Sequence, residues 1–201
     1  FPEHEMLALG VASNITMADR NGVLHSGRKD LHDMNRDLAI NGAARTLDEV
    51  MIAADAFIGV SAANALAPDL LKLMAPNPVV FALANPDPEI LPSIAHSIRS
   101  DLLMATGRSD FPNQVNNALC FPFLFRGALD ARAKQITTAM QIAAAKALAE
   151  LAREPVPDEV LKAYNLTELK FGKDYIIPKP FDPRLLERIP PKVAAAWADK
   201  I

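Results

Sequence analysis

The sequence of 201 residues contains little of several features that mark particular protein classes. A single cysteine, Cys120, excludes an internal disulfide framework and a cluster of zinc-bound thiolates. The 21 basic and 24 acidic residues give a net charge of -3, so the chain lacks the basic excess that binds nucleic acid. No apolar run reaches the roughly 20 residues that a membrane-spanning helix needs. We therefore predict a cytoplasmic protein that binds neither nucleic acid nor a membrane.

Glycine is also scarce, and the usual start of a protein is missing. The chain has 8 glycines, no two of which form a Gly-x-Gly pair. It begins at Phe1, with neither an initiator methionine nor a signal-peptide pattern. These two absences predict that the chain is the downstream part of a longer protein, which was cleaved, truncated or only partly represented.

Three short apolar segments predict strands at Ala56–Val60, Val79–Ala84 and Leu102–Ala105, and the second, which is apolar throughout, is expected to be buried on both faces. Segments of helical pattern separate them, and each ends in a cluster of small and polar residues. A fourth short strand is expected at Asn14–Ala18, before the Asn21-Gly22 turn. This alternation predicts an α/β fold with a doubly wound parallel sheet, which is Rossmann-like.

The helices are expected from caps and periodicity. Thr46 and Glu49 form a capping-box pattern that opens a short helix through Ala53. One further helix is expected to end near Val11. The remaining expected helices cover Asp69–Ala75, Glu89–Ile98, Val115–Ala131 (interrupted by Pro122), Ala133–Ala152 and Val193–Ala198.

The chain is expected to have two parts. Residues 1–154 form the sheet domain, incomplete at its N-terminus, and residues 155–201 form a helical and extended arm. The arm holds prolines 178, 180, 183, 190 and 191 and both tyrosines. With Trp197 it is a candidate contact with a neighbouring subunit of a homo-oligomer.

Ligands of parallel sheets bind at the carboxyl ends of the strands, where polar segments of this chain are expected to meet. Asp19 ends the first predicted strand, where dinucleotide-binding sheets place an acid for the adenosine ribose; a solvated turn aspartate is the equal alternative. Arg20, Arg28 and Lys29 either reach a 2′-phosphate or are solvated. Asn85 follows a buried strand and precedes Pro86; it is either a ligand contact or, more simply, a structural stop.

The densest polar stretch begins at Gly107 and ends at Asn117. Asn116 and Asn117 precede an apolar helix that one of them alone can cap, so we expect ligand contact here. Elsewhere the residues form no Ser-His-Asp set, phosphate loop or carboxylate metal cluster. The four histidines are interpreted as surface residues and Cys120 as packing, while Asp87 and Glu89 suit a helix dipole without any catalytic role.

Three segments together resemble one known family: residues 81–89 (FALANPDPE), 105–122 (ATGRSDFPNQVNNALCFP) and 175–183 (YIIPKPFDP). They are similar to the C-terminal NAD(P)-binding domain of bacterial malic enzymes, and the similarity runs nearly end to end. The resemblance implies oxidative decarboxylation of (S)-malate to pyruvate and CO2, with NAD or NADP and with Mg2+ or Mn2+.

The resemblance also implies roles for individual residues. Asn85 lies beside the nicotinamide ribose and malate, and Asn117 contacts the substrate. Asp19 binds the adenosine ribose, and Val60 and Ser61 line the cofactor groove. Candidate cofactor contacts are therefore Asp19, Arg20, Arg28, Val60, Ser61, Asn85 and Gly107.

The family's general base, its acid, its metal ligands and its glycine-rich turn have no counterpart in this chain. We therefore expect no catalytic or metal-binding residue here, and expect these groups in a missing N-terminal half of the same enzyme. Two alternatives stay open: another NAD(P)-dependent dehydrogenase, and a nucleotide-binding or interaction module without chemistry. The choice between NAD and NADP is also open, because Asp19 repels a 2′-phosphate while Arg20 and Arg28 attract one.

Overall fold

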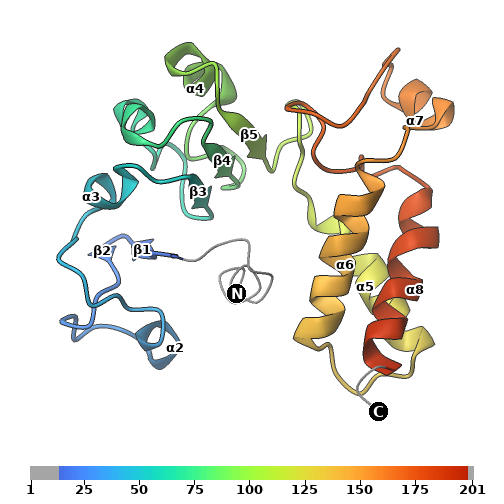
Figure 1. Ribbon diagram of the computed structural model, residues 1–201, viewed down its shortest axis with the longest axis horizontal. Helices are drawn as coiled ribbons and strands as arrows, with labels where there is room; N and C mark the ends of the chain where they lie inside the picture. Colours follow the sequence, from blue (N-terminus) through green and yellow to red (C-terminus); the bar gives the residue numbers. More distant parts are fainter. Residues whose placement is uncertain (1–13, 199–201) are drawn as a thin grey trace. The chain divides into compact units, whose positions relative to one another are not determined.

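The structure, a computed structural model, describes residues 14–198. The chain divides between residues 104 and 105 into two compact units, whose described residues are coloured blue to green and yellow-green to red in Figure 1. Each unit has a hydrophobic core of its own. The helix end expected at Val11 lies outside the described residues.

The first unit is built around a three-stranded sheet in the order β3-β4-β5 (Figure 1). The strands are β3 (Ala56–Gly59), β4 (Val79–Ala82) and β5 (Leu103–Thr106), whose last residues lead into the second unit. β3 and β4 are parallel, with Gly59 opposite Ala82. All three predicted apolar strands are confirmed, and pairing satisfies their backbone groups. β4 and β5 are buried or half-buried, whereas two of the four residues of β3 are exposed.

Short helical segments pack on this sheet. α3 (Leu47–Met51) begins with the predicted capping box, in which the Glu49 N–H donates to Thr46 Oγ1 at 3.4 Å and the Thr46 N–H donates to Glu49 Oε2 at 3.1 Å. α4 (Pro92–Ile98) connects β4 to β5 and starts later than expected, at a proline that suits the first turn. The buried core gathers side chains from α3, β4, α4 and the connections between them.

The strand predicted at Asn14–Ala18 is wrong in extent and in pairing. β1 (Ala18–Asp19) instead forms an antiparallel hairpin with β2 (Gly22–Val23), followed by α2 (Asp33–Arg36). Gly22 has φ +104°, and an added Cβ there would meet the Arg45 carbonyl oxygen. The turn was predicted, but β2, the strand that follows it, was not. Its position depends on a distant segment, because the Val23 N–H donates to the Arg45 carbonyl oxygen at 2.8 Å.

The amphipathic helix predicted at Asp69–Ala75 is a 3-10 helix, η1 (Pro68–Leu73). Its apolar face is buried as expected, through Leu70 and Leu71. Arg99 donates to the carbonyl oxygens of Leu71, Met74 and Ala75 at 2.9 to 3.0 Å. These carbonyls are therefore satisfied by the side chain of the residue that follows α4, which removes the need for a further helical turn.

The second unit is helical. Its elements are η2 (Asn117–Leu119), α5 (Phe121–Asp130), α6 (Thr138–Leu151), α7 (Asp158–Ala163) and α8 (Arg184–Ala198). α8 packs against both α5 and α6 (Figure 1). The single helix expected across Pro122 is divided at Cys120, and Pro122 lies in the first turn of α5.

The last helix begins at Arg184, nine residues before the expected start, and contains Pro190 and Pro191. Prolines weaken a helix interior because they remove a backbone donor. Here Leu185, Ile189 and Val193 recur every four residues and are 0% exposed. Burial of this face against α5 and α6 outweighs the lost hydrogen bonds, so the proline pattern predicted the wrong helix start.

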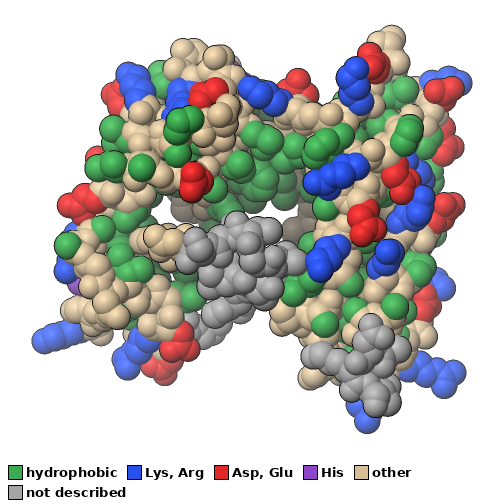
Figure 2. Space-filling view, in the orientation of Figure 1, with side chains coloured by type: hydrophobic (Ala, Val, Ile, Leu, Met, Phe, Trp, Pro, Cys, Tyr) green, Lys and Arg blue, Asp and Glu red, His purple; other side chains and the backbone are tan. Residues whose placement is uncertain are grey.

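The two compact units divide the chain between residues 104 and 105, whereas the predicted parts are residues 1–154 and 155–201. The division into a sheet domain and a C-terminal arm stays a prediction. Among the described residues, no helix is both long and apolar enough to cross a membrane. On the face in Figure 2, basic and acidic side chains are interspersed, and neither sign forms a continuous field.

Candidate functional site

The loops that follow β3 and β4 are joined at the carboxyl ends of these parallel strands. The Ser61 N–H and Oγ donate to Glu89 Oε1 at 2.7 and 3.2 Å, and the Ala84 N–H donates to Glu89 Oε2 at 3.1 Å. Ser61 is exposed, whereas Glu89 is fully buried. The structure thus brings together the β3 and β4 loops that the sequence predicted to meet.

Asn85 and Val60 lie on the exposed part of these loops. The Asn85 side-chain nitrogen donates to the Leu83 carbonyl oxygen at 3.0 Å, which leaves the amide oxygen without a hydrogen bond among the described residues. The Asn85–Pro86 peptide is cis. Val60 is 74% exposed. An exposed apolar side chain and an exposed amide therefore stand just beyond the ends of β3 and β4, and their cofactor contacts stay predictions.

Asp19 ends a strand, as predicted, but that strand is β1 of the antiparallel β1–β2 hairpin and not a strand of the parallel sheet. Its carboxylate accepts two hydrogen bonds of 2.9 Å from Arg28, and Arg28 also donates to Asp30 at 2.6 and 2.9 Å. These bonds lower the pKa of Asp19 and of Asp30, and they raise the pKa of Arg28. The predicted ribose contact of Asp19 stays a prediction.

The Arg28 side chain is 9% exposed and engaged by two carboxylates. Contact with a 2′-phosphate would require it to release at least one of them, so this contact also stays a prediction. Arg20 and Lys29 are exposed on the same segment.

In the second unit, the two adjacent asparagines have different surroundings. Asn116 Oδ1 accepts from the Ala118 N–H at 2.9 Å and so caps η2, whereas Asn117 is an exposed residue at the start of η2. Upstream, Gly107 is half-buried, and Thr106 pairs with Gln114 in a parallel bridge. Asn116 is thus explained by capping, and ligand contact by Asn117 stays a prediction.

Asn113 was not singled out from the sequence. It is 2% exposed, has φ 54°, and its side chain donates to the Lys173 carbonyl oxygen at 2.6 Å and accepts from the Ile176 N–H at 2.9 Å. It thereby connects the Gly107–Asn117 stretch to the C-terminal arm. An asparagine in a Pro-Asn turn suits the left-handed conformation, and that is the signal by which it could be found.

The interpretation of Glu89 as a dipole-matching residue of a helix is wrong, because α4 begins at Pro92. Its side chain is directed into the protein and bound to the ends of two strands. The signal in the sequence was its position between Pro88 and Ile90, both of which are buried. An acid in such an apolar setting is expected to have several hydrogen-bond partners.

Among residues 14–198 no group of three or more His, Cys, Asp or Glu side chains is arranged to hold a metal ion. Burial raises the pKa of the Cys120 thiol, which favours the unreactive protonated form. Neither a metal centre nor a cysteine nucleophile is therefore supported by the described part of the chain.

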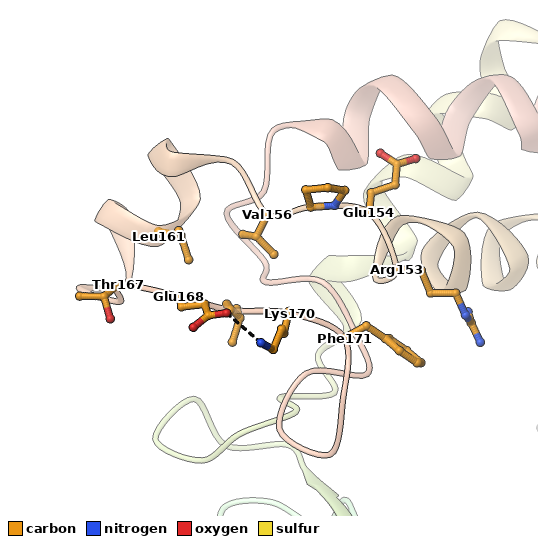
Figure 3. A pocket seen from close by; sticks show the side chains of 10 residues that line it. Arg153, Glu154, Val156, Leu161, Thr167, Glu168, Lys170 and Phe171 are labelled. Atoms are coloured by element: carbon orange, nitrogen blue, oxygen red, sulfur yellow. Dashed lines mark hydrogen bonds and ion pairs between the residues drawn. The ribbon is translucent and has the colours of Figure 1, made fainter.

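A pocket of about 360 Å³ lies in the second unit between the end of α6 and the segment after α7 (Figure 3). The Arg153 guanidinium lies over the Phe171 ring, 4.6 Å from its centroid, and Lys170 pairs with Glu168 at 3.0 Å. None of the predicted site residues lines it. Its charges are balanced within the pocket, so it offers no evident charge for a phosphate or a carboxylate.

Comparison with known proteins identifies the family. Residues 8–164 match the family described as malic enzyme, NAD binding domain. The chain belongs to this family. The NADP-dependent malic enzyme of Halomonas elongata is 53% identical over 195 residues, which are 96% of this chain and 46% of that enzyme. The NAD-dependent malic enzyme of Rhizobium meliloti is 49% identical over 187 residues, which are 92% of this chain and 24% of that enzyme.

A solved malic enzyme, that of Entamoeba histolytica, superposes with a TM-score of 0.82 at 32% identity, covering 99% of this chain and 40% of that one. The predicted Rossmann-like fold and the resemblance to malic enzymes are both confirmed. The chain spans about a quarter to a half of the length of these malic enzymes.

Proposed function

We propose that this chain is the cofactor-binding part of a longer malic enzyme, called the whole enzyme below. It would convert (S)-malate to pyruvate and CO2 with NAD+ or NADP+ and Mg2+ or Mn2+. The observation that carries the proposal is the 53% identity with a NADP-dependent malic enzyme across 96% of this chain. The loops at the ends of β3 and β4, with an exposed valine and an oriented amide, support it independently.

The residues of this chain would bind and orient rather than transfer protons. Ser61 and Val60 would line the cofactor groove, and Asn85 would offer its free amide oxygen to the nicotinamide ribose. Asn117 would donate its amide to a malate oxygen. The bound dinucleotide would accept the hydride from C2 of malate. Gly107, Asp19, Arg20 and Arg28 complete the proposed cofactor contacts.

The described residues do not fit a divalent metal site. The metal ligands, the general base and the glycine-rich turn would therefore come from the sequence that the relatives carry outside the matched span. The outer edge of β3 supports such an addition, because within residues 14–198 no strand pairs with it and Ile58 is 38% exposed. The single cysteine supports a cytoplasmic location.

The test is malate-dependent reduction of NAD+ and of NADP+ by the whole enzyme with Mn2+. We expect turnover with at least one of the two cofactors, and none from the 201-residue chain assayed alone. Lack of turnover by a folded whole enzyme would favour a nucleotide-binding module without chemistry. Sedimentation of the same sample would test the proposed homo-oligomer.

A further inference from the structure

Glu89 connects the loops that follow β3 and β4, although it belongs to neither strand. Its two carboxylate oxygens are divided between the loops: Oε1 accepts from the Ser61 N–H and Oγ, and Oε2 accepts from the Ala84 N–H. Two backbone bonds run beside these contacts, from the Asn64 N–H to the Pro88 oxygen (3.2 Å) and from the Leu66 N–H to the Glu89 oxygen (3.1 Å). The β3 loop is therefore held against the β4 loop along its length.

The space for this carboxylate exists because residue 59 is glycine. A Cβ added to Gly59 would lie 2.6 Å from Glu89 Oε1 and would also meet its Cδ. Gly59 is the last residue of β3, so the carboxylate lies directly against the strand end. Any larger residue at position 59 would displace the Glu89 side chain.

The arrangement requires an acceptor at both oxygens. A carboxylate is acceptor-only, whereas an amide presents one acceptor and one donor. In either orientation, a glutamine at position 89 would direct its NH2 group at a backbone N–H, of Ala84 or of Ser61. In the described part of the chain Glu89 takes part in no ion pair, so these hydrogen bonds alone offset the cost of its burial.

We propose that Glu89 is a positioning residue of the cofactor site. It holds Ser61 on the β3 loop and the Ala84–Asn85 segment on the β4 loop at a fixed separation. At this separation both segments contact the bound dinucleotide. Glu89 is fully buried and acts through these residues, without contact to the cofactor. Preformed loops bind more tightly because less freedom is lost on binding. This inference rests on the proposed function.

The experiment measures the dissociation constants of NAD+ and NADP+ for the whole enzyme and its Glu89→Gln variant, below the unfolding temperature of both. We expect binding of the preferred cofactor to weaken at least tenfold. Gly59→Ala, whose added Cβ displaces the same carboxylate, should also weaken cofactor binding. The matched control is Asp182→Asn, because Asp182 is also a buried carboxylate but is paired with Arg184 in the second unit. We expect it to lower stability and leave cofactor affinity within twofold.

A second measurement needs no variant. Hydrogen exchange of the cofactor-free enzyme should show protected amides at Ser61 and Ala84 before any NADP+ is added. Exchange as fast as in an exposed loop would overturn the proposal, as would equal affinities in the unmodified and Glu89→Gln enzymes. Failure of the unmodified enzyme to bind either dinucleotide would instead contradict the proposed function.

Discussion

The Arg28 guanidinium holds both carboxylate oxygens of Asp19, with Nη1–Oδ1 and Nη2–Oδ2 distances of 2.9 Å. Along its other edge, Nε and Nη2 donate to the Asp30 carboxylate. Nη1 also donates to the Gly22 carbonyl oxygen at 3.3 Å. One side chain thus connects the β1–β2 hairpin to the segment that follows it. The hairpin is stabilised by ion pairs that depend on ionised carboxylates.

We predict that Arg28→Ala lowers the melting temperature at pH 7 and that the difference from the unmodified chain shrinks in acid. The folded pKa of Asp19 and Asp30 is depressed, so their contribution is complete above the unfolded value of about 3.9 and is lost as pH falls below it. Thermal unfolding at pH 7 and pH 3 measures this. Arg28→Lys keeps the charge without the paired geometry and should be intermediate. A difference independent of pH would contradict the prediction.

Asn113→Asp is predicted to loosen the C-terminal arm. The aspartate keeps an acceptor for the Ile176 N–H but directs an oxygen at the Lys173 carbonyl. We expect a loss of about 1–3 kcal/mol in the free energy of unfolding, because the buried side chain at position 113 loses one hydrogen bond and sets two acceptor oxygens against each other. Urea unfolding gives the magnitude, and faster hydrogen exchange over residues 172–178 locates it. The exposed neighbour Ser109, changed to alanine, is the control and should show neither effect.

Gly127→Ala is predicted to destabilise the second unit. A Cβ there would lie 2.6 Å from the Pro190 carbonyl oxygen and 2.7 Å from Val193 Cβ, where α5 meets α8. Overpacking of this kind costs about 1–3 kcal/mol, which exceeds the helix preference gained. Gly172→Ala is the matched control, since its Cβ would meet nothing closer than 3.8 Å, and should stay within about 0.5 kcal/mol. Equal unfolding free energies for the two variants would refute the close approach.

Asn117→Ala is predicted to raise the KM of the whole enzyme for malate roughly tenfold, the loss expected for one hydrogen bond to a charged group. Asn116→Ala removes the η2 cap instead, and should cost about 1 kcal/mol of stability with the malate KM unchanged. Steady-state kinetics and thermal unfolding of both variants separate the two roles. Unchanged malate kinetics in Asn117→Ala would remove this residue from the site.

Features that depend on a few neighbouring residues were predictable. The Thr46–Glu49 capping box and the three strands of the parallel sheet were confirmed because caps and apolar runs act within one turn or one strand. The family was also predictable, since its motifs are continuous stretches of sequence. The hairpin at Asp19 and the start of α8 were not, because each depends on what the segment packs against.

The sequence by itself determined the three strands of the parallel sheet, the class of that sheet and the family. Only the tertiary structure decided which polar groups are buried and what they hold. Glu89 meets Ser61, 28 residues away in the chain, and Asn113 meets Ile176, 63 residues away. Neither partner can be read from local pattern, because a buried polar group is satisfied by whichever donor or acceptor the fold brings to it. Asn116 and Asn117 are both exposed, and the sequence predicted that one of them caps the helix; the structure shows that Asn116 is the one that does.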